Sequence, residues 1–270
     1  MNDIGNMSLT GAIVQPPSPN FAAGLTTVDL GTPVFELALK QHAAYCEALQ
    51  RCGLTLTWLP PEPLYPDATF VEDTAILTDR YAILTRPGAL TRTGEVSRME
   101  EVLSSLYSTI HAISEPGTLD GGDVCEAGDH FFIGISQRTN EAGAKQLADL
   151  LAAYDYTSSF IDVREVRNIL HLKSGLAYLG DNRLVVIEAI AGSELFADYE
   201  QVVVAQGEEY AANCVRVNNY LLIASGFPGF EKRLHDLGYQ TLALEMSEFQ
   251  KMDGGLSCLS LRYPIQNRER

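Results

Sequence analysis

The segment Gly122–Ser136 reads GDVCEAGDHFFIGIS. Two of its runs, Gly122–Glu126 and Phe131–Ser136, are rich in Val, Ile and Phe, and the turn Ala127-Gly128-Asp129 separates them. β-Branched and aromatic residues favour extended backbone, whereas glycine and aspartate favour tight turns. The segment therefore predicts a β-hairpin.

The same arrangement recurs three more times along the chain. Each copy has two short apolar runs separated by a turn that contains Gly, Asn or Asp. Four hairpins of similar composition indicate a repeated unit. The other expected hairpins are Val71–Leu77 with Tyr81–Arg86, Ser174–Leu179 with Leu184–Glu188, and Cys214–Val217 with Tyr220–Ala224.

A helix and a third strand are expected after each hairpin. Apolar residues recur at helical spacing in residues 96–106, 144–151, 193–199 and 231–237. A further helix, Pro33–Cys52, precedes the first hairpin; Thr32 is its expected N-cap, Pro33 suits its first position and Gly53 its end. The expected third strands are Thr55–Leu59, Thr109–Ile113, Ser159–Val163, Gln201–Ala205 and Thr241–Leu244.

Two further strands, Gly11–Val14 and Cys258–Tyr263, lack a hairpin partner. Pairing them would complete a fifth unit and close a ring, which protects the edges of the sheets. We therefore expect an α/β fold, a five-bladed α/β propeller of repeated ββαβ modules around a central channel, with residues 1–270 forming a single domain. An ordinary mixed α/β sandwich is the alternative that periodicity alone leaves open.

The composition is that of an acidic globular protein. The 270 residues include 19 Lys and Arg against 35 Asp and Glu, which gives a formal net charge of −16. This charge argues against binding to nucleic acid phosphates or to anionic membranes. The sequence has no apolar run of transmembrane length and no recognisable signal peptide, and its five cysteines form no CxxC pair, which is typical of a reduced cytoplasmic protein. No P-loop, GxGxxG, HExxH or EF-hand pattern occurs, so we expect no nucleotide or metal cofactor.

The ring would bring the starts of the first strands to one end of the channel. Those starts carry Glu72, Asp73, Asp120, His171 and Cys258. A cysteine thiolate can attack an electrophilic carbon, and histidine can carry protons near neutral pH. The alternatives are a buried core cysteine and a hydrogen-bonded structural histidine.

The acidic residues of this set suit a cationic ligand. Glu72 and Asp73 lie between apolar residues, and carboxylates bind a planar guanidinium through paired hydrogen bonds. Adjacent strand residues point to opposite faces, but at a strand entrance both could reach the channel mouth. Asp120 could hold His171 in one tautomer. Solvated surface charge and a Gly-rich acidic turn are the alternatives.

Two arginines, Arg92 and Arg138, follow the second strands of their modules in loops. Either could bind a carboxylate through two parallel hydrogen bonds. A surface ion pair is the alternative in a chain this acidic.

Seven segments, taken in chain order, resemble the dimethylarginine dimethylaminohydrolase family of guanidino-group-modifying enzymes. They are PDATFVED (66–73), TRPGA (85–89), LDGGD (119–123), RTN (138–140), LHLKS (170–174), ANC (212–214) and DGGLSC (253–258). The resemblance runs from about Leu25 to the C-terminus and implies a five-bladed α/β propeller, in agreement with the repeat.

The resemblance also implies roles at matching positions. Cys258 would be the nucleophile, His171 the general acid and base, and Asp120 the residue that orients His171, although some relatives have Glu there. The other matches would bind the substrate: Glu72 and Asp73 its guanidinium, Arg92 and Arg138 its α-carboxylate, and Asp67, with backbone carbonyls near Leu25 and Met252, its amino-acid end.

The implied reaction is hydrolysis of Nω-methylated arginines to citrulline and methylamine or dimethylamine through a covalent cysteine thiouronium. Arginine deiminases of this superfamily typically carry His-x-Asp, whereas this chain has His171-Leu172-Lys173, which favours a methylated substrate. Hydrolysis of arginine or a related guanidino or ureido compound, and a non-catalytic binding propeller, are the alternatives. The expected partner is therefore a small molecule, without nucleic acid or membrane, and the outer helices leave a homodimer open.

Overall fold

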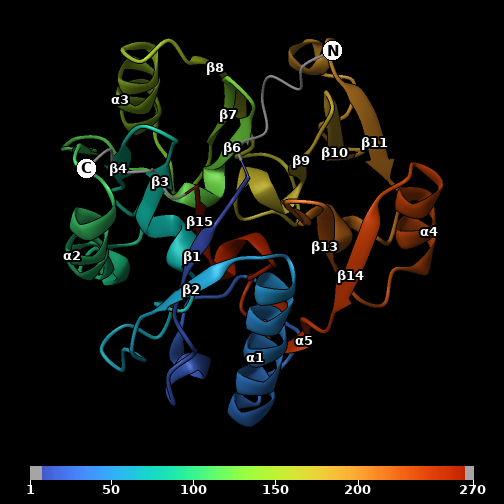
Figure 1. The fold of residues 1–270 in the computed structure, drawn as a ribbon, viewed down its shortest axis with the longest axis horizontal. Helices are drawn as coiled ribbons and strands as arrows, with labels where there is room; N and C mark the ends of the chain where they lie inside the picture. The colour runs from blue at the N-terminus through green and yellow to red at the C-terminus, as the bar shows by residue number, and fades with distance from the viewer. Residues whose placement is uncertain (1–7, 265–270) are drawn as a thin grey trace.

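This computed structural model describes residues 8–264. They contain five sheets of three strands each. Figure 1 shows the sheets arranged around a common centre. The strands are β1 (Gly11–Val14), β2 (Thr55–Trp58), β3 (Ala75–Leu77), β4 (Ala82–Leu84), β5 (Ile110–Ala112), β6 (Val124–Ala127), β7 (His130–Ile135), β8 (Thr157–Asp162), β9 (Leu176–Gly180), β10 (Arg183–Ile187), β11 (Glu200–Val204), β12 (Val215–Val217), β13 (Tyr220–Ala224), β14 (Gln240–Leu244) and β15 (Leu261–Tyr263). The helices are α1 (Phe35–Arg51), α2 (Glu95–Leu106), α3 (Glu141–Ala152), α4 (Pro228–Asp236) and α5 (Ser247–Gln250).

Every sheet has the same strand directions. The first and second strands are antiparallel and the second and third are parallel, as in β6-β7-β8, where Ile133 of β7 pairs with Val124 and Phe160. In the last sheet β15 runs antiparallel to β1, with Gly11 opposite Tyr263, and β1 runs parallel to β2. The two strands that lack hairpins therefore close the ring, and the five-module fold predicted from the repeat is confirmed.

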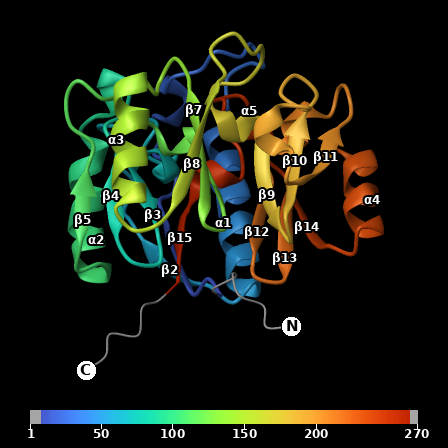
Figure 2. The ribbon, with the colours of Figure 1, turned by 90° about the horizontal axis from the view of Figure 1, so that it is seen from above.

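Helices α1 to α4 cover the outside of the ring (Figures 1 and 2). Each amphipathic helix buries its apolar stripe against neighbouring strands. In α3, Leu147 and Leu151 are buried in one cluster with Phe131 and Ile133 of β7. No helix within residues 8–264 combines the length and the apolar character that a membrane span needs.

The first strands of all five modules line a central cavity of about 630 Å³. Its walls include Ile76, Cys125, Tyr178, Arg216 and Leu261, one residue from each first strand. At one end the cavity reaches the hairpin turns, and at the other it ends against Glu72, Lys173 and Ser257. The candidate site lies beyond that second end.

The expected first strands begin too early, because their first residues form 3-10 turns. These turns are η2 (Val71–Thr74), η4 (Gly121–Asp123), η5 (Leu172–Ser174) and η8 (Ser257–Leu259), with η7 (Glu209–Ala212) in the equivalent place before β12. All four residues of η2 are buried, so the sequence shows no alternation of buried and exposed residues that would mark where the turn ends and the strand begins. The turns contact one another in ring order, η8 with η2, η2 with η4, η4 with η5 and η5 with η7.

The expected start of the first helix is also wrong. Helix α1 begins at Phe35 with Val34 as its N-cap, and no side chain of that cap residue satisfies the first turn. The carboxylate of Glu248, from α5, accepts the hydrogen bond of the Val34 N–H at 2.6 Å. A residue 214 positions away thus replaces Thr32 as the local cap, while Gly53 ends the helix with φ +93 as expected.

The helix expected over residues 193–199 is shorter in the structure. It is a single 3-10 turn, Glu194–Phe196, with Ser193 as its N-cap, and it buries Phe196. Only this one large apolar side chain of the turn is buried, so one turn is enough to bury it.

Candidate active site

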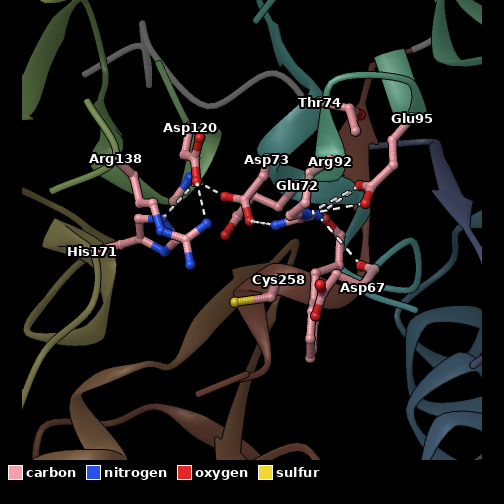
Figure 3. Close-up of polar contacts among 12 residues, drawn as sticks. Asp67, Glu72, Asp73, Thr74, Arg92, Glu95, Asp120, Arg138, His171 and Cys258 are labelled. Atoms are coloured by element: carbon pink, nitrogen blue, oxygen red, sulfur yellow. Dashed lines mark hydrogen bonds and ion pairs between the residues drawn. The ribbon is translucent and has the colours of Figure 1, made fainter. Parts of the chain in front are cut away.

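The ring of 3-10 turns brings the predicted polar residues to one place (Figure 3). Glu72 and Asp73 belong to η2, and Cys258 belongs to η8. Asp120 and His171 are the residues that immediately precede η4 and η5. In Figure 3 the thiol of Cys258 faces the space in front of His171 and Arg138. Residues up to 186 positions apart in the chain therefore form one site, because a 3-10 turn of the same kind precedes the first strand of each module.

His171 is buried and charged. Its Nε2 lies 3.1 Å from Oδ2 of Asp120. Burial alone would lower the pKa of His171, but the carboxylates of Asp73 and Asp123 and the hydrogen bond to Asp120 raise it from 6.5 to about 9. The ring fits because position 122 is glycine: a Cβ there would lie 2.7 Å from His171 Nδ1. At neutral pH the site therefore holds an imidazolium that can donate a proton.

Asp120 and Asp73 are held on either side of this imidazole. The N–H of Gly88 donates to Oδ1 of Asp120 at 2.8 Å, and the N–H of Gly122 donates to Oδ1 of Asp73 at 2.8 Å. Burial would raise the pKa of Asp73, but the charges of His171 and Arg92 lower it to about 2. Asp73 is therefore an anion over the whole physiological range.

Cys258 carries a thiol that is protonated in the ligand-free site. Burial, and then the carboxylates of Glu72 and Asp73, raise its pKa from 9 to about 12. The N–H of Gly255, 3.5 Å from the sulfur, opposes this effect. A cation placed among these groups would offset the carboxylates and favour the thiolate.

Glu72 lies beneath the site and is engaged on both of its oxygens. Oε1 lies 2.7 Å from Nζ of Lys173 and 3.5 Å from Nη2 of Arg262. Oε2 accepts a hydrogen bond of 2.7 Å from the hydroxyl of Ser257. Glu72 and Asp73, expected at the entrance of a strand, belong instead to a buried 3-10 turn, where the alternation of a strand does not apply.

The two candidate arginines occupy different environments. Arg92 is 3% exposed and donates to the carboxylates of Asp73 and Glu95 and to the carbonyls of Asp67 and Phe70. Its guanidinium therefore lies in the wall of the site, joined to Asp73, and a contact with the substrate carboxylate stays a prediction.

Arg138 lies beside His171 at the open side of the site, with Nη1 3.9 Å from Oδ2 of Asp120 (Figure 3). Its side chain keeps 15% exposure. This ion pair with Asp120 is longer than a hydrogen bond, so the guanidinium can still donate hydrogen bonds to an incoming carboxylate.

Asp67, Leu25 and Met252 form the third predicted group. The carboxylate of Asp67 accepts the N–H of Leu25 at 3.0 and 3.2 Å, and burial raises its pKa. Gly24 packs between Asp67 and Met252, where a Cβ would lie 2.3 Å from Asp67 Oδ1 and 3.1 Å from the Met252 methyl. The structure thus brings these three residues together at one edge of the site.

Other residues of the site carried no role in the sequence reasoning. Asp123, the second acid of the LDGGD segment, accepts the hydroxyls of Ser136 at 2.6 Å and Thr139 at 2.7 Å and the N–H of Leu172 at 2.9 Å. It thereby ties the loop that carries Arg138 to the residue after His171. Glu95, Asn213 and Ser257 were also missed; the segments ANC and DGGLSC contain the last two, but their contacts depend on residues far away in the chain.

Within residues 8–264, Asp73, Asp120 and His171 also form a set whose geometry could hold a metal ion, with one ligand atom of each within 4.8 Å of the others. These atoms already bond within the protein: Asp120 Oδ2 to His171, and Asp73 to Gly122 and Arg92. The group is therefore satisfied as a hydrogen-bonded cluster.

Comparison with known proteins gives one consistent family. A model described as N,N dimethylarginine dimethylhydrolase, eukaryotic, matches residues 31–219. The N(G),N(G)-dimethylarginine dimethylaminohydrolase of Pseudomonas aeruginosa is 40% identical over 93% of this chain and 98% of its own. The protein of the same name from Streptomyces coelicolor is 35% identical over 93% of this chain and 96% of its own.

Solved structures agree. A cysteine-to-serine variant of the Pseudomonas aeruginosa protein, complexed with citrulline, superposes with a TM-score of 0.91 at 39% identity, covering 94% of this chain and 99% of that one. A histidine-to-glycine variant of a dimethylarginine dimethylaminohydrolase, solved as an adduct with S-methyl-L-thiocitrulline, gives the same TM-score, identity and coverage. The N-terminal domain of a cyanobacterial arginine dihydrolase shares the fold, with a TM-score of 0.84 at 17% identity over 95% of this chain and 99% of that one.

Proposed function

Because the chain belongs to the dimethylarginine dimethylaminohydrolase family, we propose that it hydrolyses Nω-methylated arginines to citrulline and methylamine or dimethylamine. The observation that carries the proposal is the meeting of Cys258 with the His171–Asp120 pair beside an anionic Asp73. A nucleophile, a proton donor and a binding group for a cation are what this chemistry requires. The citrulline complex of the Pseudomonas aeruginosa relative supports the same class of ligand.

The substrate would bind first through opposite charges. The guanidinium would pair with the carboxylate of Asp73 above Glu72, which places its central carbon in front of the sulfur of Cys258. Arg138 would pair with the α-carboxylate, and Asp67 with the α-amino group. The cationic substrate also lowers the pKa of the thiol, which releases its proton to solvent and becomes the thiolate; the substrate thus helps to ionise its own nucleophile.

The first chemical step is attack of the Cys258 thiolate on the guanidinium carbon. A C–S bond forms, the tetrahedral adduct collapses, and the bond to the methylated nitrogen breaks. The imidazolium of His171 gives its proton to the departing amine, and a covalent thiouronium remains on Cys258. Asp120 keeps the imidazole in place throughout.

The second step regenerates the enzyme. Neutral His171 accepts a proton from water, and the resulting hydroxide attacks the thiouronium carbon. The C–S bond breaks, citrulline leaves, and His171 is again an imidazolium. The same residue thus acts as acid and then as base, as microscopic reversibility requires.

The preference for a methylated substrate rests on what lies beyond His171. Lys173 occupies the second position after His171, and its Nζ is paired with Glu72 beneath the site. No carboxylate stands there to accept the N–H groups of an unmethylated guanidinium. Without such an acceptor, an unmethylated guanidinium gains no hydrogen bond that would favour it over a methylated one.

The test is citrulline formation from asymmetric dimethylarginine and, in parallel, from arginine. We expect turnover of the methylated substrate and little turnover of arginine. The reverse preference would make the chain an arginine hydrolase, and no citrulline from either compound would overturn the proposal. Cys258→Ser serves as the control that excludes a contaminating activity.

A further inference from the structure

One polar side chain joins the two reacting turns and has no part in the reaction described above. Asn213 lies between η7 and β12, in the ANC segment, and is 6% exposed. It belongs to the fourth hairpin module, which supplies none of the groups that would touch the substrate.

The carboxamide of Asn213 spans two other modules. Its Oδ1 accepts the N–H of Ser257 at 2.9 Å. Its Nδ2 donates to the hydroxyl of Ser257 at 3.0 Å and to the carbonyl of Lys173 at 3.0 Å. Ser257 directly precedes Cys258, and Lys173 lies two residues after His171, so both donors of one amide link the two turns.

These contacts are part of a closed polar ring. The hydroxyl of Ser257 donates a hydrogen bond of 2.7 Å to Glu72, and Glu72 forms an ion pair of 2.7 Å with Nζ of Lys173. The path from Asn213 through Ser257, Glu72 and Lys173 thus returns to Asn213. Four modules are connected beneath the sulfur and the imidazole, and each member restrains its neighbours.

The glycines before Cys258 fit this arrangement. A Cβ at Gly255 would lie 2.5 Å from both Cγ and Oδ1 of Asn213 and 2.9 Å from Nδ2. The backbone at Gly255 therefore packs directly against the carboxamide, and its N–H also points at the Cys258 sulfur. Asn213 shapes the turn from one side while the thiol lies on the other.

We propose that Asn213 is a positioning residue that holds the turn of Cys258 in register with the turn of His171. The claim rests on the proposed function in that these two residues are the reacting pair. Asparagine is required because the position needs one acceptor and two donors at once. Aspartate has the same shape but no donors, and it would face the Lys173 carbonyl with a negative charge.

The experiment compares Asn213→Ala and Asn213→Asp with wild type. We expect kcat for asymmetric dimethylarginine to fall by about 10²-fold, the scale of a displacement of about 1 Å, while KM stays within about threefold. Aspartate should not rescue kcat. The rate at which iodoacetamide alkylates Cys258, followed by peptide mapping across pH, should rise because the released turn exposes the thiol.

Asn218→Gly is the matched control. Asn218 also bridges segments with its amide, to Leu9 and Cys52, but it lies in the β12–β13 turn at the other end of the cavity. Its φ of +53 suits glycine, so the substitution removes the bridge without straining the backbone. It should lower the thermal unfolding midpoint and leave kcat and Cys258 alkylation unchanged.

Two results would overturn the positioning role: a loss of kcat no larger than in Asn218→Gly, or an unchanged alkylation rate of Cys258 in Asn213→Ala. The alkylation needs no substrate. If wild-type protein forms no citrulline, the proposed function fails, and alkylation still decides the role of Asn213.

Discussion

At the scale of single residues, the charges of neighbouring groups decide the protonation states of the buried His171 and Asp73. Burial opposes both shifts, yet the pKa of His171 rises to about 9 and that of Asp73 falls to about 2. Neighbouring opposite charges outweigh desolvation for these two groups. For Cys258 burial and the neighbouring carboxylates both raise the pKa, so the thiol is protonated in the ligand-free site.

The raised pKa of His171 predicts how stability depends on pH. The pKa of about 9 lies above the ordinary 6.5, so the stabilisation by the imidazolium is complete below about pH 6.5 and is lost as the pH rises through about 9. We expect the free energy of unfolding, measured with urea, to fall across this window in the wild type. The fall should be smaller in His171→Asn, and equal slopes in the two proteins would contradict the assignment.

Replacing the thiol of Cys258 should abolish turnover without lowering stability. Cys258→Ser removes the sulfur nucleophile but keeps a side chain of similar size and weakens only long hydrogen bonds, 3.5 Å from Gly255 N and 4.0 Å to Ser257 Oγ. We expect turnover to fall by at least about 10⁴-fold with an unchanged thermal unfolding midpoint. Retained turnover in this variant would contradict the covalent mechanism.

The two arginines predict different phenotypes. Arg138→Ala removes a partner for the substrate carboxylate, so KM should rise about tenfold or more while kcat changes little. Arg92→Ala leaves the buried carboxylates of Asp73 and Glu95 without their cation, which costs about 3–5 kcal/mol of stability. Steady-state kinetics and urea unfolding of both variants separate the roles; a stable Arg92→Ala with raised KM would favour direct substrate binding.

At the scale of elements, short 3-10 turns do what a longer strand could not. A strand would direct neighbouring side chains to opposite faces, whereas the turns before β3, β6, β9 and β15 keep consecutive polar residues inside the ring. The amphipathic helices carry the outer packing, and the turns carry the groups proposed to react. Packing and the proposed chemistry therefore depend on different elements of the same module.

Helix α1 tests the contribution of a distant cap. The carboxylate of Glu248 accepts the Val34 N–H, and its own backbone N–H donates to Oε1 of Gln41 in α1. Glu248→Ala should cost about 1 kcal/mol of stability, the usual value of an N-cap. The exposed Glu47 on the same helix offers the control Glu47→Ala, and equal unfolding midpoints for the two variants would contradict the capping role.

At the scale of the whole molecule, stability depends on closure between the two ends of the described chain. Ile13 of β1 is fully buried with Leu261 and Tyr263 of β15. Ile13→Ala should lower the free energy of unfolding by about 2–5 kcal/mol, because it opens a cavity where the ring closes. Leu64→Ala, at a site 80% exposed, is the control. An equally small effect of both substitutions in urea unfolding would show that closure contributes little.

The ring also decides the proposed chemistry as a whole. Asp73, Asp120, His171 and Cys258 come from four different modules, and none of the four hairpins alone contains a nucleophile with its proton donor. A local opening at the β1–β15 seam should therefore impair activity before the individual sheets unfold.

The sequence by itself determined the repeat and indicated which residues we propose to react. Hairpin turns, strand composition and helical periodicity are local properties, so the five modules and their order could be predicted without knowing any long-range contact. The segments LHLKS and DGGLSC carry His171 and Cys258 in a pattern specific enough to indicate the family. The first strands began at the wrong residues because a fully buried run has no periodicity.

Only the tertiary structure decided how the polar groups share their partners. Glu95 lies only three residues after Arg92, but nothing local to Arg92 indicates that Asp73 also pairs with it. Likewise, nothing local to Asn213 indicates that it bridges Ser257 and Lys173. The cap of α1 by Glu248 is likewise a contact over 214 residues. Propensity and periodicity report what neighbouring residues prefer, whereas hydrogen bonds and ion pairs between modules exist only after the ring has closed.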